Sequence, residues 1–219
     1  MLTENNPDNS QDNTSIFNNK VSFICYIYEY ENIKIIGYKT GKIEFYQINV
    51  EGKINLVSEF YDHKDEIIHI NYNPRLNMIC SSSKDGFLNV YSLPNKLITT
   101  IQHPKRNKNN FGLVFLASNP FPCIIALDYD IMEMHSYSIN GFKIKSENIY
   151  DFLKIYKGEK LDLYTFSYFN ENGGTFKDRL IMAIGNKKGK EDKLECHVIR
   201  VPFFQEEEKT IDFRNKKMN

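Results

Sequence analysis

The chain has 219 residues, of which 41% are hydrophobic and 26% charged, and its 28 Lys and Arg residues balance 28 Asp and Glu residues. This composition excludes a disordered chain, and the length fits one large domain or two small ones. A formal net charge of zero gives no general reason to expect nucleic acid or an acidic membrane as a partner. No apolar run approaches the roughly 20 residues of a membrane-spanning helix, and the first residues do not resemble a signal peptide. We therefore expect a cytoplasmic protein without a transmembrane segment.

The two ends of the chain differ in composition from its interior. Residues 1–20 are polar and rich in Asn, Asp and Ser, which predicts a disordered N-terminal lead. Residues 205–219 form a charged C-terminal tail, in which a frayed last strand or a short helix could start.

The interior is predicted to consist of short strands. The apolar runs are β-branched and aromatic, and each is bounded by turn residues such as those at 39–41, 51–52 and 84–86. Only residues 149–157 have weak helical character. The clearest predicted strands are 21–30, 33–38, 43–48, 54–60, 67–72, 78–83 and 87–93.

Many short strands at even spacing fit a sandwich, a barrel or a propeller, and an internal repeat decides among these. The segment Thr40–Tyr46 aligns with Asp85–Tyr91, about 45 residues later, and a third segment ends in Tyr137. This period with four strands per unit is typical of propeller blades, which must stack to bury their faces. The sequence thus predicts an all-β chain that forms a partial β-propeller of about four blades, each of four antiparallel strands. The expected blades are residues 21–62, 63–103, 104–150 and 151–204.

The second unit resembles the WD-repeat family. It contains His63 before a strand, the run Ser81-Ser82-Ser83, and the turn Asp85-Gly86 followed by Tyr91. In that family a His, a Ser or Thr, an Asp and a strand Trp form a hydrogen-bonded network inside the blade. The resemblance implies a structural network of His63, Ser81 or Ser83, Asp85 and Tyr91. A buried carboxylate in a turn needs donors, which an imidazole and a hydroxyl supply.

A narrower resemblance covers residues 60–150. The segments 77–95, 120–125 and 136–144 look like the C-terminal WD-repeat region of BEACH-domain (beige-like) proteins, and Ser138-Ile139-Asn140-Gly141 is the most characteristic piece. Those proteins are large scaffolds in vesicle and lysosome-related membrane traffic. The resemblance implies that upstream blades and a BEACH domain belong to the full-length protein.

The sequence indicates no catalytic, cofactor or metal site. The five His residues form no HExxH or His/Cys cluster, so metal binding is not expected. Neither a GxSxG motif nor a P-loop is present, and the glycines and lysines at 185–190 lack a following helix. We therefore expect a non-enzymatic protein.

Function in a propeller lies on the loops that its rigid blades present. We predict a protein–protein interaction scaffold of the BEACH type, cytoplasmic and peripheral to vesicle membranes, with at most indirect membrane association and no nucleic-acid partner. The alternatives are a WD-repeat subunit of an unrelated assembly and, third, a propeller-fold enzyme. By resemblance to WD repeats, the candidate partner-binding residues on the top face are Lys39, Glu66, Ile68 and Lys84.

Overall fold

The computed structural model describes residues 21–27, 32–104, 111–128, 130–152, 161–169, 179–188, 191–200, 203 and 205–208. The expected lead at residues 1–20 and residues 209–219 of the tail lie outside the described residues. The described part consists of strands in four antiparallel four-stranded sheets, together with one helix of four residues. The all-β class predicted from the strand pattern is confirmed.

The four sheets use consecutive strands in chain order. The first sheet contains β1 (Val21–Ile27), β2 (Ile33–Tyr38), β3 (Ile43–Ile48) and β4 (Ile54–Phe60). The second contains β5 (Ile67–Asn73), β6 (Met78–Ser83), β7 (Phe87–Ser92) and β8 (Lys96–Gln102). The third contains β9 (Leu113–Ala117), β10 (Cys123–Asp128), β11 (Glu133–Ser138) and β12 (Lys143–Asn148), and is followed by helix α2 (Ile149–Phe152). The fourth contains β13 (Leu161–Phe169), β14 (Arg179–Lys188), β15 (Glu191–Arg200) and β16 (Gln205–Glu208). Strand β16 begins where the sequence placed the charged tail, so the fourth sheet extends past residue 204.

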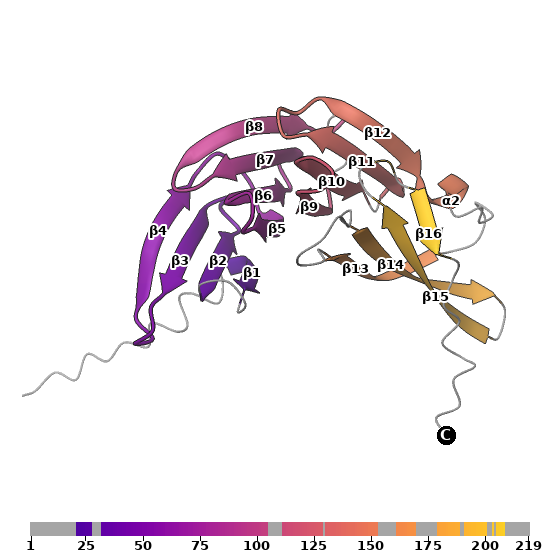
Figure 1. Ribbon diagram of the computed structural model, residues 1–219, viewed down its shortest axis with the longest axis horizontal. Coiled ribbons are helices and arrows are strands. Elements are labelled where there is room, and N and C mark those ends of the chain that lie inside the picture. Colours follow the sequence, from indigo (N-terminus) through magenta and orange to yellow (C-terminus); the bar gives the residue numbers. More distant parts are fainter. Residues whose placement is uncertain are drawn as a thin grey trace, which may run out of the picture.

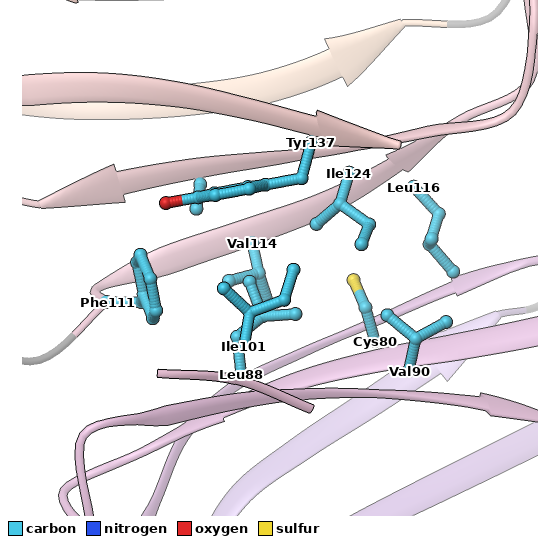
Figure 2. Packing of buried hydrophobic residues seen from close by; sticks show 10 residues of the cluster. Cys80, Leu88, Val90, Ile101, Phe111, Val114, Leu116, Ile124 and Tyr137 are labelled. Atoms are coloured by element: carbon cyan, nitrogen blue, oxygen red, sulfur yellow. The ribbon is translucent and has the colours of Figure 1, made fainter. Parts of the chain in front are cut away.

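The sheets stack through apolar side chains. In a strand alternate residues point to opposite faces, so a sheet that is apolar on both faces must be covered on both. Between the second and third sheets, Cys80 and Val90 on one side meet Leu116 and Ile124 on the other, and all four are fully buried (Figure 2). Similar clusters join the first sheet to the second and bring Ile199 of β15 onto the third sheet.

The inner edge of the third sheet is closed by side chains of the second. Strand β9 pairs only with β10, which leaves the backbone groups of its other edge without a strand partner. Asn71 Oδ1 accepts from the Leu116 amide at 3.0 Å, and Asn73 Nδ2 donates to the Leu116 carbonyl at 2.7 Å. His69 Nδ1 accepts from the Val114 amide at 3.4 Å. Alternate residues of β5 thus satisfy an edge that would otherwise need water or another strand.

Hairpins between the third and fourth strands pack on the outer strand of the preceding sheet. Ser58 of β4 donates to the Pro94 carbonyl in the β7–β8 hairpin, and Gly141 in the β11–β12 hairpin lies against Thr99 of β8. Lys145 of β12 donates to the Phe203 carbonyl before β16 at 2.9 Å. Each outer strand also carries a one-residue bulge, at residues 57, 98, 144 and 207. We call the β3–β4, β7–β8 and β11–β12 hairpins (residues 49–53, 93–97 and 139–143) the hairpin rim.

The four sheets follow one another along an arc (Figure 1). Strands β1, β5, β9 and β13 lie on its inner side, and β4, β8 and β12 on its outer side. Among the described residues, no extensive contact joins the first sheet to the fourth. This arrangement is the partial, four-blade propeller that the repeat predicted.

The hydrogen bond between His69 and Val114 predicts a pH-dependent stability. Burial lowers the pKa of the His69 imidazole from 6.5 to about 4, and Nδ1 accepts the Val114 proton only when it is unprotonated. Below about pH 6.5 the unfolded chain binds a proton that the folded chain does not bind until about pH 4, so His69 should remove about 2 kcal/mol of unfolding free energy over this window. Urea unfolding at pH 7.5 and pH 4.5 measures this loss. His69→Gln keeps an acceptor that does not titrate, and an unchanged pH dependence in this variant would contradict the assignment.

Candidate functional site

The candidate site lies where β6 and β7 are joined, at the end of the second sheet opposite the hairpin rim. The β6–β7 turn (residues 84–86) and the loop before β5 (residues 63–66) meet there, because Ile67 pairs with Ser83. The β2–β3 turn of the first sheet comes next to this loop, since a Cβ on Gly41 would lie 2.4 Å from the His63 carbonyl oxygen. Gly41 has φ 87°, which also favours glycine. We call these three segments the turn face.

Asp85 is the centre of a hydrogen-bond network that fixes the turn face. Its carboxylate accepts from His63 Nδ1 at 3.0 Å, from the Lys64 amide at 2.9 Å and from the Phe87 amide at 3.0 Å. Burial opposes ionisation, but the hydrogen bonds from His63 and from the two amides outweigh it and hold the pKa of the carboxyl below its usual range. One carboxylate therefore joins the β6–β7 turn to the loop before β5.

The network continues into the sheet through Ser81. His63 Nε2 lies 2.8 Å from Ser81 Oγ. Asn89 Nδ2 donates to the Tyr91 hydroxyl at 3.1 Å, and the Ser81 hydroxyl bonds the same phenol, whose pKa burial raises. Ser81 is thus the hydroxyl that bonds His63. Ser83 instead donates to the Asp65 carbonyl at 2.8 Å and accepts from the Asp85 amide at 3.2 Å. The hydrogen bonds from His63, Ser83 and Asp85 thus hold the two loops together.

Three of the four candidate partner-binding residues, Lys39, Glu66 and Lys84, lie on the turn face. Lys84 Nζ pairs with Glu66 Oε2 at 2.6 Å, and the side chains are 52% and 28% exposed. The Lys84 amide also donates to the Glu66 carbonyl at 2.9 Å. Ile68 is the residue of β5 left unpaired where the register shifts, and it is half-buried. Lys39 is exposed on the neighbouring sheet. The structure therefore brings Glu66 and Lys84 into contact, and places Ile68 and Lys39 at the same end of the sheets.

Sequence reasoning missed a second histidine–aspartate pair in the third sheet. His103 Nε2 lies 2.7 Å from Asp128 Oδ2, and the two side chains are 1% and 0% exposed. Asp128 also accepts from the amides of Asp130 and Ile131. His103 precedes the third sheet as His63 precedes the second. This correspondence was the signal in the sequence that could have predicted the pair. The aspartate partner was hidden because β9 begins ten residues after His103, whereas β5 begins four residues after His63.

A third polar cluster covers the face of the first sheet that points away from the second. Glu44 accepts from the hydroxyls of Tyr38 and Tyr46 and pairs with Lys42 at 2.6 Å. Burial and the Glu44 charge raise the pKa of Tyr46 to about 12. Lys42 also pairs with Glu59. The sequence places Glu44 and Tyr46 two residues apart in one predicted strand and Tyr38 in the strand before it. It did not indicate that the three side chains meet on one face of the sheet.

The described residues contain no group of three or more His, Cys, Asp or Glu side chains placed to hold a metal ion. None of the described helices has the length and apolar character required to span a bilayer.

Two of the solved structures that are similar to this chain serve as examples. Sqt1 of Saccharomyces cerevisiae superposes with a TM-score of 0.54 and 12% identity, over 82% of this chain and 47% of that one. The β-propeller domain of Cps50 (Swd1) of Myceliophteria thermophila superposes with a TM-score of 0.51 and 10% identity, over 89% of this chain and 56% of that one. At such identities the likeness establishes the fold alone, that of a β-propeller. The chain spans about half the length of these structures. No protein-family model and no curated protein matches it.

The network predicts a specific loss of stability on removing its carboxylate. Asp85→Ala leaves the His63 imidazole and two amides without their acceptor, so the free energy of unfolding should fall by about 1–3 kcal/mol. Asp62→Ala removes an exposed carboxylate one residue before His63 and should change stability by less than about 0.5 kcal/mol. Urea unfolding at pH 7 compares the two. Equal free energies of unfolding for the Asp85→Ala variant and the parent would show that the network does not stabilise the fold.

Proposed function

We propose that the chain is a non-enzymatic protein-interaction scaffold that binds a partner through the turn face. The exposed Lys84–Glu66 pair carries this proposal. The pair sits on two segments that Asp85 and His63 already hold together, so a partner meets charges in fixed positions and little ordering entropy opposes binding. A rigid scaffold with charged loops at its end is a common basis for recognition.

We further propose that the partner surface belongs to the C-terminal WD-repeat part of a BEACH-type protein in vesicle or lysosome-related membrane traffic. The support is the resemblance over residues 60–150, with Ser138-Ile139-Asn140-Gly141 its most characteristic piece. Reading the transcript upstream of this region tests the assignment directly. A BEACH domain encoded shortly before it is expected. An upstream region without one leaves a WD-repeat subunit of an unrelated assembly, for which the turn face would serve equally.

Charge reversal on the turn face should weaken binding without unfolding the protein. Lys84→Glu places a second carboxylate beside Glu66, and Lys39→Glu reverses the charge on the neighbouring turn. Both side chains are exposed, so the melting temperature should stay within a few degrees of the parent. In a pull-down of native partners, we expect capture by the double Lys39→Glu/Lys84→Glu variant to fall at least about tenfold.

Two controls make this experiment specific. The exchange Glu66→Lys/Lys84→Glu keeps the ion pair but swaps the positions of its two charges. It therefore distinguishes the effect of losing the ion pair from the effect of changing the charge that a partner meets at each position. Lys96→Glu reverses an exposed lysine at the opposite end of the second sheet and should leave capture unchanged. If native partners were still captured after reversal of both Lys39 and Lys84, the turn face would not be the binding surface.

A further inference from the structure

Most large exposed apolar side chains of the described residues lie at the end of the sheets opposite the turn face, and Leu56 and Val57 lie midway along β4. Tyr61 lies at the other end. The others lie in the hairpin rim, in the outer strand that leaves it, in the β9–β10 loop, or just before β16. They are Val50, Ile54, Leu56, Val57, Leu97, Phe121, Phe142 and Phe203. Single exposed apolar residues are ordinary, but a one-sided distribution indicates a contact surface.

Each hairpin of the rim combines an exposed apolar residue with an exposed lysine. The apolar side chains are 101%, 39% and 74% exposed in the first, second and third hairpins. The pairs are Val50 with Lys53, Leu97 with Lys96, and Phe142 with Lys143. The first hairpin also contains the exposed Glu51, its one acidic residue. The same combination thus occurs in the corresponding hairpin of three sheets, at different positions within each hairpin.

The hairpins are held in place. Asn49 Oδ1 accepts from the Lys53 amide at 2.8 Å, and Ser138 Oγ accepts from the Phe142 amide at 3.1 Å. The second and third hairpins also pack on the outer strand of the preceding sheet, through Pro94 and Gly141. The sheets repeat one strand order along the arc (Figure 1). Equivalent hairpins therefore lie on the same side of the arc and can meet one flat surface together.

At the other end two lysines pair with carboxylates, whereas the exposed Lys39 and Lys64 have no carboxylate partner among the described residues. Lys42 pairs with Glu44 and Glu59, and Lys84 pairs with Glu66. Within the described part of the chain, no carboxylate pairs with Lys53, Lys96 or Lys143. The rim therefore presents positive charge that no carboxylate of the described residues neutralises.

We propose that the hairpin rim binds the surface of a membrane that contains anionic phospholipid. Val50, Leu97 and Phe142 enter the boundary between headgroups and acyl chains, and the lysine beside each contacts headgroup phosphates. A protein partner would favour one compact, packed centre of apolar anchors. The rim instead offers separate apolar–lysine pairs spread along an arc, which suits a flat and laterally uniform surface.

The absence of tryptophan from the chain provides a direct test. Phe142→Trp introduces a single fluorescent reporter at an exposed position of the rim. With vesicles of phosphatidylcholine and about one third phosphatidylserine, its emission should shift to shorter wavelength and brominated lipid should quench it. Vesicles of phosphatidylcholine alone should produce neither change. Tyr61→Trp places the reporter at an exposed position of the other end, 65% exposed in the parent, and should show no shift.

Vesicle cosedimentation of charge variants gives the second readout. Lys96→Glu/Lys143→Glu should weaken binding to the anionic vesicles by about thirtyfold or more, since each lysine near such a surface contributes about 1 kcal/mol. Lys39→Glu/Lys64→Glu makes the same change of net charge at the other end and should bind like the parent. If the rim variant melts early, binding of the parent over rising salt replaces it, and the affinity should fall.

Several results would overturn the proposal. These are no response of Phe142→Trp to anionic vesicles, an equal response to neutral vesicles, an equal shift in Tyr61→Trp, or equal losses in the two charge variants. Absence of vesicle binding would leave the rim as a surface for an acidic protein. Partner capture through Lys84 is measured separately, so failure here does not decide the proposed scaffold function.

Discussion

The structure depends on one constraint, which is that a small sheet with two apolar faces cannot exist alone. Strand β6 illustrates it, because Ile79 points into the cluster shared with the first sheet and Cys80 into the cluster shared with the third, and both are fully buried. A central sheet is therefore stable only between two neighbours. Stacking also sets the geometry of everything else, since it aligns equivalent turns at one end of the sheets and equivalent hairpins at the other.

Stacking leaves polar backbone groups to be satisfied, and the chain does this with side chains. Asn71 and Asn73 close the inner edge of β9. His63 and Asp85 hold the loop that enters the second sheet, and His103 and Asp128 hold the corresponding loop of the third. The two ends of the sheets consequently become rigid surfaces of different chemistry. Both ends carry exposed lysines, but the turn face adds the Lys84–Glu66 ion pair, whereas the hairpin rim adds exposed apolar side chains.

Much of this could be predicted from the sequence because it is local. Short β-branched and aromatic runs between turn residues located the strands, and the shared Gly41 and Gly86 turns defined the repeat. The spacing from His63 to Asp85 also predicted groups that the structure brings within hydrogen-bond distance. These signals lie within one unit, where the strand and turn lengths are regular.

The remaining features depend on how units meet, which no local pattern encodes. Val114 and His69 are 45 residues apart and touch only because two sheets stack. Asp128 was missed because it is the last residue of β10, whereas Asp85 lies in the turn after β6, and because β9 begins farther from His103 than β5 does from His63. The hairpin rim was missed for a different reason. Its pairs are unremarkable singly, and only their placement on the same side of the arc makes them a surface.

The central claim is that the sheets form one cooperative unit because they share apolar clusters. Native-state hydrogen exchange of the intact chain tests it most directly. Val90 is fully buried between the second and third sheets, so Val90→Ala should remove about 1–2 kcal/mol of packing free energy. The account predicts that amide protection then falls together in β6, β7, β9 and β10. A loss of protection confined to the second sheet, with β9 and β10 unchanged, would contradict it.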